Sequence, residues 1–192
     1  MARIAVDAMG GDFAPRAPIA GSLLALAELP TEHEIELVGR SAVIEAELNA
    51  LLAGELSALH AHRSRVHIVN APDVLEMTDK PSVVLRAKAN SSMVVGIRRV
   101  ADGFAHGFVS AGNTGAQMVA SLAHLKLHAG LTRPAIGTIF PTANQSVLVL
   151  DSGANVDCSA EELVQFARIG TVYAHDLLGR HNPTVGLLSI GE

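Results

Sequence analysis

The segment SAGNTGA at residues 110–116 places short polar side chains and two glycines between an apolar run and an Ala-rich segment. If the apolar run is a strand and the Ala-rich segment is a helix, unpaired backbone N–H groups and the helix macrodipole favour an anion at their junction. The glycines would let a phosphate-type ligand approach the backbone, while the serine, asparagine and threonine would offer hydrogen bonds. The candidate residues are Ser110, Gly112, Asn113, Thr114 and Gly115. The alternative is a plain turn in which Thr114 only caps the helix.

A second glycine-rich segment, DAMGGD at 7–12, also follows a short apolar run. Its backbone could reach the same ligand, which makes Gly10, Gly11 and Asp12 candidates for phosphate binding. The alternative is a glycine turn between solvated aspartates. Neither segment is a P-loop, because no Lys-Ser or Lys-Thr pair follows the second glycine of 110–116. The chain also lacks a G-x-G-x-x-G motif and an acidic ribose anchor, which disfavours a nicotinamide cofactor.

Basic side chains are sparse, so their positions matter. Lys80, Arg86 and Lys88 lie at and after the end of a polar loop at 72–81. As a group they are the obvious cationic partners for a phosphate, because charge-assisted hydrogen bonds from Lys and Arg are the strong ones. Any one of them could instead be a solvated helix residue.

The segment DSGANVD at 151–157 places Asp151, Asn155 and Asp157 around a glycine. These side chains could bind a ligand or a metal, but such residues more often cap the following helix and tie the loop together. Two histidines four residues apart in the helix after 110–116 lack the Glu of the H-E-x-x-H motif. We therefore expect no metal site, and keep Asp151 and Asn155 as candidate binding residues.

Apolar periodicity predicts the elements that would position these segments. Strands are expected at 3–8, 34–39, 65–71, 107–111 and 184–192, and helices at 17–29, 41–54, 82–103 (with a possible break at 90–92), 114–128 and 159–179. Ser41 is expected to cap the second helix, and Ser159 with Glu162 fits a capping box. Apolar runs on both sides of PTANQ, near 135–151, predict an antiparallel hairpin. The alternation predicts an α/β domain over 1–192 with a mostly parallel sheet, and ligands gather at the carboxyl ends of such strands.

Composition narrows the function classes. The chain has 192 residues, of which 49% are hydrophobic, 17% charged and 3% aromatic, with a net charge of −5. The acidic balance and the few aromatic residues argue against nucleic-acid binding. A single cysteine, Cys158, fits a reducing cytoplasm. No segment is apolar for the roughly 18 residues that a membrane span needs.

Several motifs resemble the bacterial phosphate acyltransferase (PlsX) family, in the same order from one end of the chain to the other. They are RIAVDAMGGDFAP, VLEMTDKPSVVLRAKANSSM, VSAGNTGA, RPAI, LDSGANVDCSAEELVQFARIG and VGLLSIGE. The resemblance implies a three-layer α/β/α fold, similar to that of isocitrate and isopropylmalate dehydrogenases, in a homodimer. Family members are longer, so residues 1–192 would be an N-terminal portion, and they usually have Asn where Ser189 stands.

The family resemblance implies an enzyme of phospholipid synthesis that moves a fatty acyl group from acyl carrier protein to inorganic phosphate, without a metal or organic cofactor. It also implies a cytoplasmic enzyme, peripheral to the inner face of the membrane and attached through the part of the family's chains beyond residue 192. The rival readings are a phosphate acetyltransferase using acetyl-CoA, a nicotinamide-dependent decarboxylating dehydrogenase, and a binding module without turnover.

Phosphate is already an anionic nucleophile, so the acyl transfer needs no activated Ser or Cys. It needs a site that binds phosphate, holds a thioester carbonyl beside it and stabilises the developing oxyanion. The catalytic candidates are therefore Asn113, Thr114, Arg86 and Lys88. The candidates for substrate or phosphate binding are Gly10, Gly11, Asp12, Lys80, Ser110, Gly112, Gly115, Asp151 and Asn155.

Overall fold

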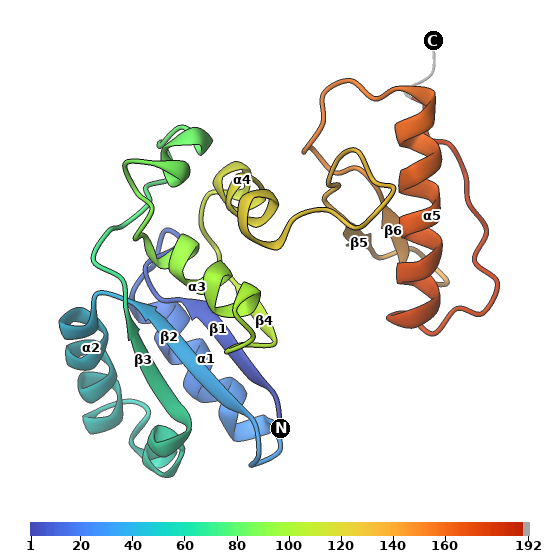
Figure 1. The fold of residues 1–192 in the computed structure, drawn as a ribbon. Helices are drawn as coiled ribbons and strands as arrows, with labels where there is room; N and C mark the ends of the chain where they lie inside the picture. The colour runs from blue at the N-terminus through green and yellow to red at the C-terminus, as the bar shows by residue number, and fades with distance from the viewer. Residues whose placement is uncertain (190–192) are drawn as a thin grey trace. The chain divides into compact units, whose positions relative to one another are not determined.

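The computed structural model describes residues 1–189, which form two compact units that divide after Lys126. The first unit contains a four-stranded parallel sheet in the order β3-β2-β1-β4 (Figure 1). Its strands are β1 (Arg3–Asp7), β2 (Glu34–Gly39), β3 (Val66–Asn70) and β4 (Gly107–Val109). The expectation that residues 1–192 form a single domain of a longer chain stays a prediction.

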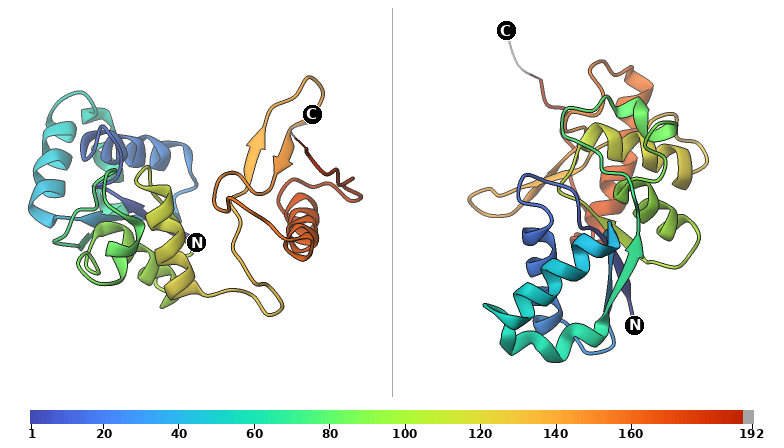
Figure 2. Two further views of the ribbon diagram at one scale, coloured as in Figure 1. Left: turned by 90° about the horizontal axis from the view of Figure 1, so that it is seen from above. Right: turned by 90° about the vertical axis from the view of Figure 1, so that its left-hand side faces the viewer.

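Helices cover both faces of this sheet, as both views of Figure 2 also show. The helices on the sheet are α1 (Arg16–Glu28), α2 (Ser41–Ala53) and α3 (Ser92–Ala101). The helix α4 (Thr114–Leu125) packs against α3 and the short 3₁₀ segment η2 (Pro81–Leu85), and a second 3₁₀ segment, η1 (Ser57–Arg65), packs beside α1 and α2. The first two helices share a buried cluster with one face of β2, and α3 packs on the opposite face. The expected α/β class, with a helix layer on each side of a mostly parallel sheet, is confirmed.

Side-chain alternation along β2 explains this layering. Ile35 and Leu37 point into the cluster with α1 and α2, whereas Val38 belongs to the cluster on the α3 face. Glu36 shares that second face and is only 1% exposed. Successive residues of a strand face opposite sides, so this strand must bury both of its faces.

The possible break at 90–92 is confirmed, because α3 begins at Ser92 and Ser91 caps it by accepting a hydrogen bond from the Val94 N–H (3.4 Å). Three expectations about the elements are wrong. The segment before that break is not an α-helix but the 3₁₀ segment η2 followed by turns. Arg40, not Ser41, occupies the N-cap of α2. No strand is present over 184–189, because an apolar run forms one only beside a partner strand that takes its backbone hydrogen bonds. Residues 190–192, the end of that expected strand, lie outside the described residues.

The second unit contains a two-stranded antiparallel sheet and one helix. Its strands β5 (Thr138–Phe140) and β6 (Val147–Val149) pair around the PTANQ turn, which confirms the hairpin. Its helix α5 (Ala160–Asp176) begins with the expected capping box between Ser159 and Glu162.

Gly96 of α3 is expected to resist substitution because the helix backbone lies directly on β4. A Cβ at this position would come within 2.2 Å of the Phe108 ring. Gly96→Ala should lower the free energy of unfolding by about 1–2 kcal/mol, since overpacking outweighs the gain in helix propensity. The matched control is Gly21→Ala in α1, where a Cβ meets nothing within 4 Å. It should instead stabilise by about 0.5–1 kcal/mol. Urea unfolding of both variants decides this, and equal stabilisation would show that the Phe108 ring yields freely.

Candidate functional site

The loops that follow β1 and β4 lie against each other at the carboxyl edge of the sheet. A Cβ on Gly10 would come within 2.5 Å of the Asp7 carboxylate and 2.9 Å of the Ser110 hydroxyl. Gly11 has a φ of +95° and faces Ala111, whose Cβ would be 3.0 Å away from an added Cβ. The structure thus brings the two glycine-rich segments together, and the glycines permit that contact.

A buried carboxylate lies beneath both loops. Asp7 is 3% exposed; its Oδ1 accepts from the Met9 N–H (3.0 Å) and its Oδ2 from the Ser110 hydroxyl (2.7 Å). The Ser110 oxygen in turn accepts from the Gly112 N–H (3.0 Å). The Ser110 proton and the Gly112 N–H are therefore already engaged within the protein.

Asn113 joins the start of α4 to the polar loop after β3. Its Oδ1 accepts from the Ala116 N–H (3.0 Å), which makes Asn113, and not Thr114, the N-cap. Its Nδ2 donates to the backbone carbonyl oxygens of Met77 (3.1 Å) and Asp79 (3.0 Å). The side chain thus has both a capping role and a clamping role.

The first turn of α4 keeps free backbone donors. The N–H groups of Asn113, Thr114 and Gly115 have no hydrogen-bond partner among residues 1–189. These donors and the positive end of the helix macrodipole can receive an anion. We call these three N–H groups, at residues 113–115, the candidate cradle. It contains fewer donors than the sequence predicts, because the Gly112 N–H is already bonded to Ser110.

The three candidate basic residues differ in whether their side chains have partners within the protein. Lys88 Nζ donates to the Val74 carbonyl oxygen and to the Asp79 carboxylate, both at 2.6 Å. The side chains of Lys80 and Arg86 are exposed and make no hydrogen bond or ion pair with any described residue. Asp12 is likewise exposed, without a described partner. Lys80 immediately precedes Pro81, whose Cγ would be 2.9 Å from a Cβ on Gly115, so its backbone lies beside the first turn of α4.

Asp151 and Asn155 belong to the second unit, where they organise their own loop. Asp151 accepts from the backbone N–H groups of Ile136 and Asn155, both at 2.6 Å, and Asn155 Nδ2 donates to the Pro134 carbonyl oxygen (3.0 Å). These contacts fit the loop-tying interpretation. Within the described residues, no group of three or more His, Cys, Asp or Glu side chains is placed to hold a metal ion.

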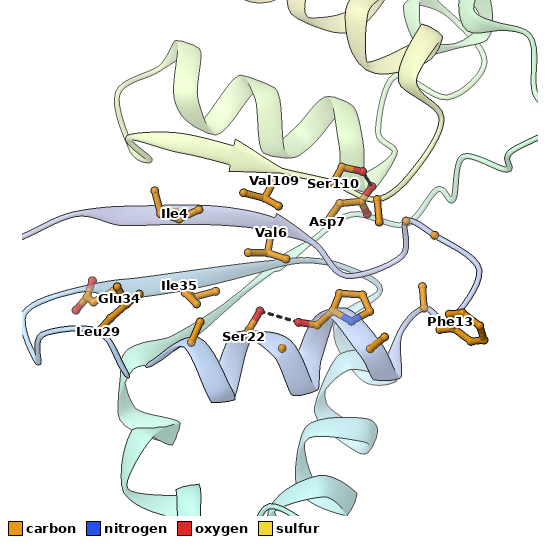
Figure 3. A pocket seen from close by; sticks show the side chains of 18 of the residues that line it. Ile4, Val6, Asp7, Phe13, Ser22, Leu29, Glu34, Ile35, Val109 and Ser110 are labelled. Atoms are coloured by element: carbon orange, nitrogen blue, oxygen red, sulfur yellow. Dashed lines mark hydrogen bonds between the residues drawn. The ribbon is translucent and has the colours of Figure 1, made fainter. Parts of the chain in front are cut away.

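An apolar groove of about 620 Å³ runs from these loops along the sheet (Figure 3). Ile4, Val6 and Val109 form its floor, and α1 forms the opposite wall. Gly10 and Ser110 line it next to the candidate cradle. Its walls offer an anion few polar partners, so the free N–H groups and Lys80 remain the feature suited to phosphate.

The Asp79–Lys88 pair should make stability depend on acid pH. The Lys88 ammonium, and then the Glu76 N–H, lower the pKa of Asp79 below its usual value of about 4. A lowered folded-state pKa stabilises the protein above the unfolded-state pKa, and this contribution disappears as the pH falls through the folded-state value. Asp79→Asn should therefore be less stable than the unsubstituted chain at pH 7, and the difference should shrink as the pH falls below about 4. Urea midpoints across that range test this, and a constant difference would contradict it.

Sequence reasoning did not identify two acidic residues, Asp7 and Asp79, as part of this site. Asp7 stands in the DAMGGD segment, but alternation along β1 did not show that it turns toward Ser110. Asp79 stands beside Lys80, and nothing in its spacing indicates that it pairs with Lys88. Both contacts join residues from different segments, which periodicity does not reveal.

Comparison with known proteins supports the resemblance. The sequence matches the family described as fatty acid synthesis protein over residues 2–192. It is 47% identical over 190 residues to a phosphate acyltransferase of Salinibacter ruber, covering 99% of this chain and 54% of that protein. It is 46% identical to phosphate acyltransferases of Heliobacterium modesticaldum (99% and 54% covered) and Stutzerimonas stutzeri (98% and 50% covered).

The chain spans about half the length of these curated relatives. None of the helices over residues 1–189 is long and apolar enough to span a bilayer. The match covers nearly every residue of this chain, including each segment of the candidate site in the first unit. The chain therefore belongs to the fatty acid synthesis protein family, with phosphate acyltransferases among its relatives.

Proposed function

We propose that this chain carries the phosphate-binding part of an enzyme that transfers a fatty acyl group from acyl carrier protein to inorganic phosphate. The observation that carries the proposal is the first turn of α4. Three backbone N–H groups without partners among the described residues lie next to the backbone of Lys80, whose side chain is exposed. This geometry suits an anion, and phosphate is the anion in the name of the relatives.

In the proposed reaction a phosphate oxygen attacks the carbonyl carbon of the thioester. The carbon–sulfur bond breaks, the thiol of the carrier leaves, and acyl phosphate forms. The N–H groups at 113–115 would hold phosphate or the developing oxyanion, and Lys80 would offset the negative charge. Fixing phosphate beside the carbonyl carbon supplies much of the rate through proximity.

The proposal extends to the partners of the enzyme. Acyl carrier protein is the acyl donor, the enzyme acts as a homodimer in the cytoplasm, and it associates with the inner face of the membrane through polypeptide that is not in residues 1–192. These features rest on the family resemblance and on the relatives' greater length. Asn113, Thr114, Arg86, Asp12, Asp151 and Asn155 stay candidates for roles in turnover or binding.

The test is the loss of palmitoyl thioester from acyl carrier protein, with and without phosphate, in the presence of the 192-residue chain. Phosphate-dependent loss is the expected result. Faster turnover with acetyl-CoA than with the carrier thioester would favour a short-chain acetyltransferase. Phosphate binding without thioester loss would leave a binding module, and neither binding nor loss in a folded chain would overturn the proposal.

A further inference from the structure

Lys88 holds the polar loop after β3 in a closed turn. Its ammonium donates to the Val74 carbonyl oxygen and the Asp79 carboxylate, both at 2.6 Å. The same carboxylate oxygen accepts from the Glu76 N–H (2.8 Å), and the Asp79 N–H donates to the Glu76 carbonyl oxygen (3.1 Å). Lys88 thus bridges both ends of the segment 74–79.

The end of this loop is fixed onto the first turn of α4. The Asp79 carbonyl oxygen, which belongs to the peptide group joining Asp79 to Lys80, accepts from Asn113 Nδ2 (3.0 Å). On the other side of Lys80, Pro81 lies against Gly115. The Lys80 backbone is therefore held between two contacts with α4, while its side chain is exposed and has no partner in the described part of the chain.

We propose that Lys88 is a positioning residue for the phosphate site and that Lys80 is the lysine that contacts the anion. This inference rests on the proposed function of the same site. Two of the three donors of the Lys88 ammonium are engaged by the loop, and its side chain is 27% exposed. The Lys80 ammonium has all its donors available, and the Lys80 backbone lies beside the first turn of α4.

Loss of Lys88 affects the anion site in two ways. The loop loses the bridge that orders it, so the Lys80 backbone is no longer held in one place. The Asp79 carboxylate also loses its cation. It then competes with phosphate for the ammonium of the neighbouring Lys80. Both effects weaken phosphate binding through Lys80, without any contact between Lys88 and the anion.

A double-mutant cycle on phosphate affinity tests this in the 192-residue chain, with inorganic phosphate as the titrant in calorimetry. Lys80→Met should weaken binding by roughly tenfold, as expected for a charged hydrogen bond. Lys88→Met should weaken it several-fold in the unsubstituted chain and hardly at all in the Lys80→Met background. The matched control is Lys126→Met, an exposed lysine at the other end of α4, about 18 Å away by helix rise. Lys126→Met should leave the phosphate affinity within about twofold of that of the unsubstituted chain.

Hydrogen exchange supplies a readout that does not depend on phosphate. Lys88→Met should speed amide exchange in 74–80 and leave the amides of α1 unchanged, and Lys88→Arg should restore part of the protection. Additive losses of affinity from the two lysine substitutions would mean direct contact by Lys88 and would overturn the proposal, as would unchanged exchange in the loop. If the unsubstituted chain does not bind phosphate, the proposed function fails, and the exchange arm still decides whether Lys88 orders the loop.

Discussion

Replacing Arg99 by Met is expected to lower the free energy of unfolding by about 3 kcal/mol, because it leaves a buried carboxylate without its main partner. Arg99 donates to both oxygens of Glu36, at 2.8 and 2.6 Å, and the Glu36 side chain is 2% exposed. The second cation near Glu36 is Arg3, at 3.6 Å. Arg3 offsets only part of the loss, since it is also bonded to Glu34 at 2.6 Å.

The control for Arg99→Met removes an arginine from an exposed ion pair. Arg63 lies 3.3 Å from Glu45, and their side chains are 33% and 48% exposed. Arg63 also donates to the Val66 carbonyl oxygen (3.0 Å). Arg63→Met should cost about 1 kcal/mol, because water screens the ion pair and a single hydrogen bond to a backbone carbonyl adds little. Adding Glu36→Gln to Arg99→Met should recover part of the loss, since it removes the unpaired charge. Urea unfolding measures all three variants, and equal losses for Arg99→Met and Arg63→Met would show that burial of Glu36 does not matter.

The sequence predicts an element well where a single segment carries the whole signal for it. The strand at 34–39 alternates between two buried faces and was predicted at its observed bounds. The capping box before α5 needs only Ser159 and Glu162, three residues apart. Such local patterns fix an element without knowledge of its neighbours.

The sequence fails where an outcome depends on distant partners. Residues 82–85 were expected to be helical, but they belong to the 3₁₀ segment η2, which packs beside α4. The glycines at 10 and 115 were expected to expose the backbone to a ligand. Their lack of a side chain also admits Asp7 and Pro81, respectively. Only the assembled sheet edge shows which N–H groups stay free.

Asn113→Ala is expected to lower the free energy of unfolding by about 2–3 kcal/mol, the second-largest effect that we foresee. The side chain caps α4 and also donates twice to the loop, at 3.1 and 3.0 Å. Losing an N-cap costs about 1 kcal/mol, and each hydrogen bond to a backbone carbonyl contributes about 0.5–1 kcal/mol. The same variant should speed hydrogen exchange in 74–80 and weaken phosphate binding.

Asn113→Ser separates the two roles, because serine can cap a helix but cannot reach two carbonyl oxygens of the loop. It should recover about 1 kcal/mol relative to Asn113→Ala while leaving the loop loose and phosphate binding weak. The matched control is Ser91, which caps α3 but makes no side-chain hydrogen bond to the loop. Among residues 1–189, its hydroxyl oxygen accepts only from the Val94 N–H. Ser91→Ala should cost about 1 kcal/mol without changing exchange in 74–80. If Asn113→Ser instead restored both stability and phosphate affinity, the clamp would contribute nothing and the cap alone would explain Asn113.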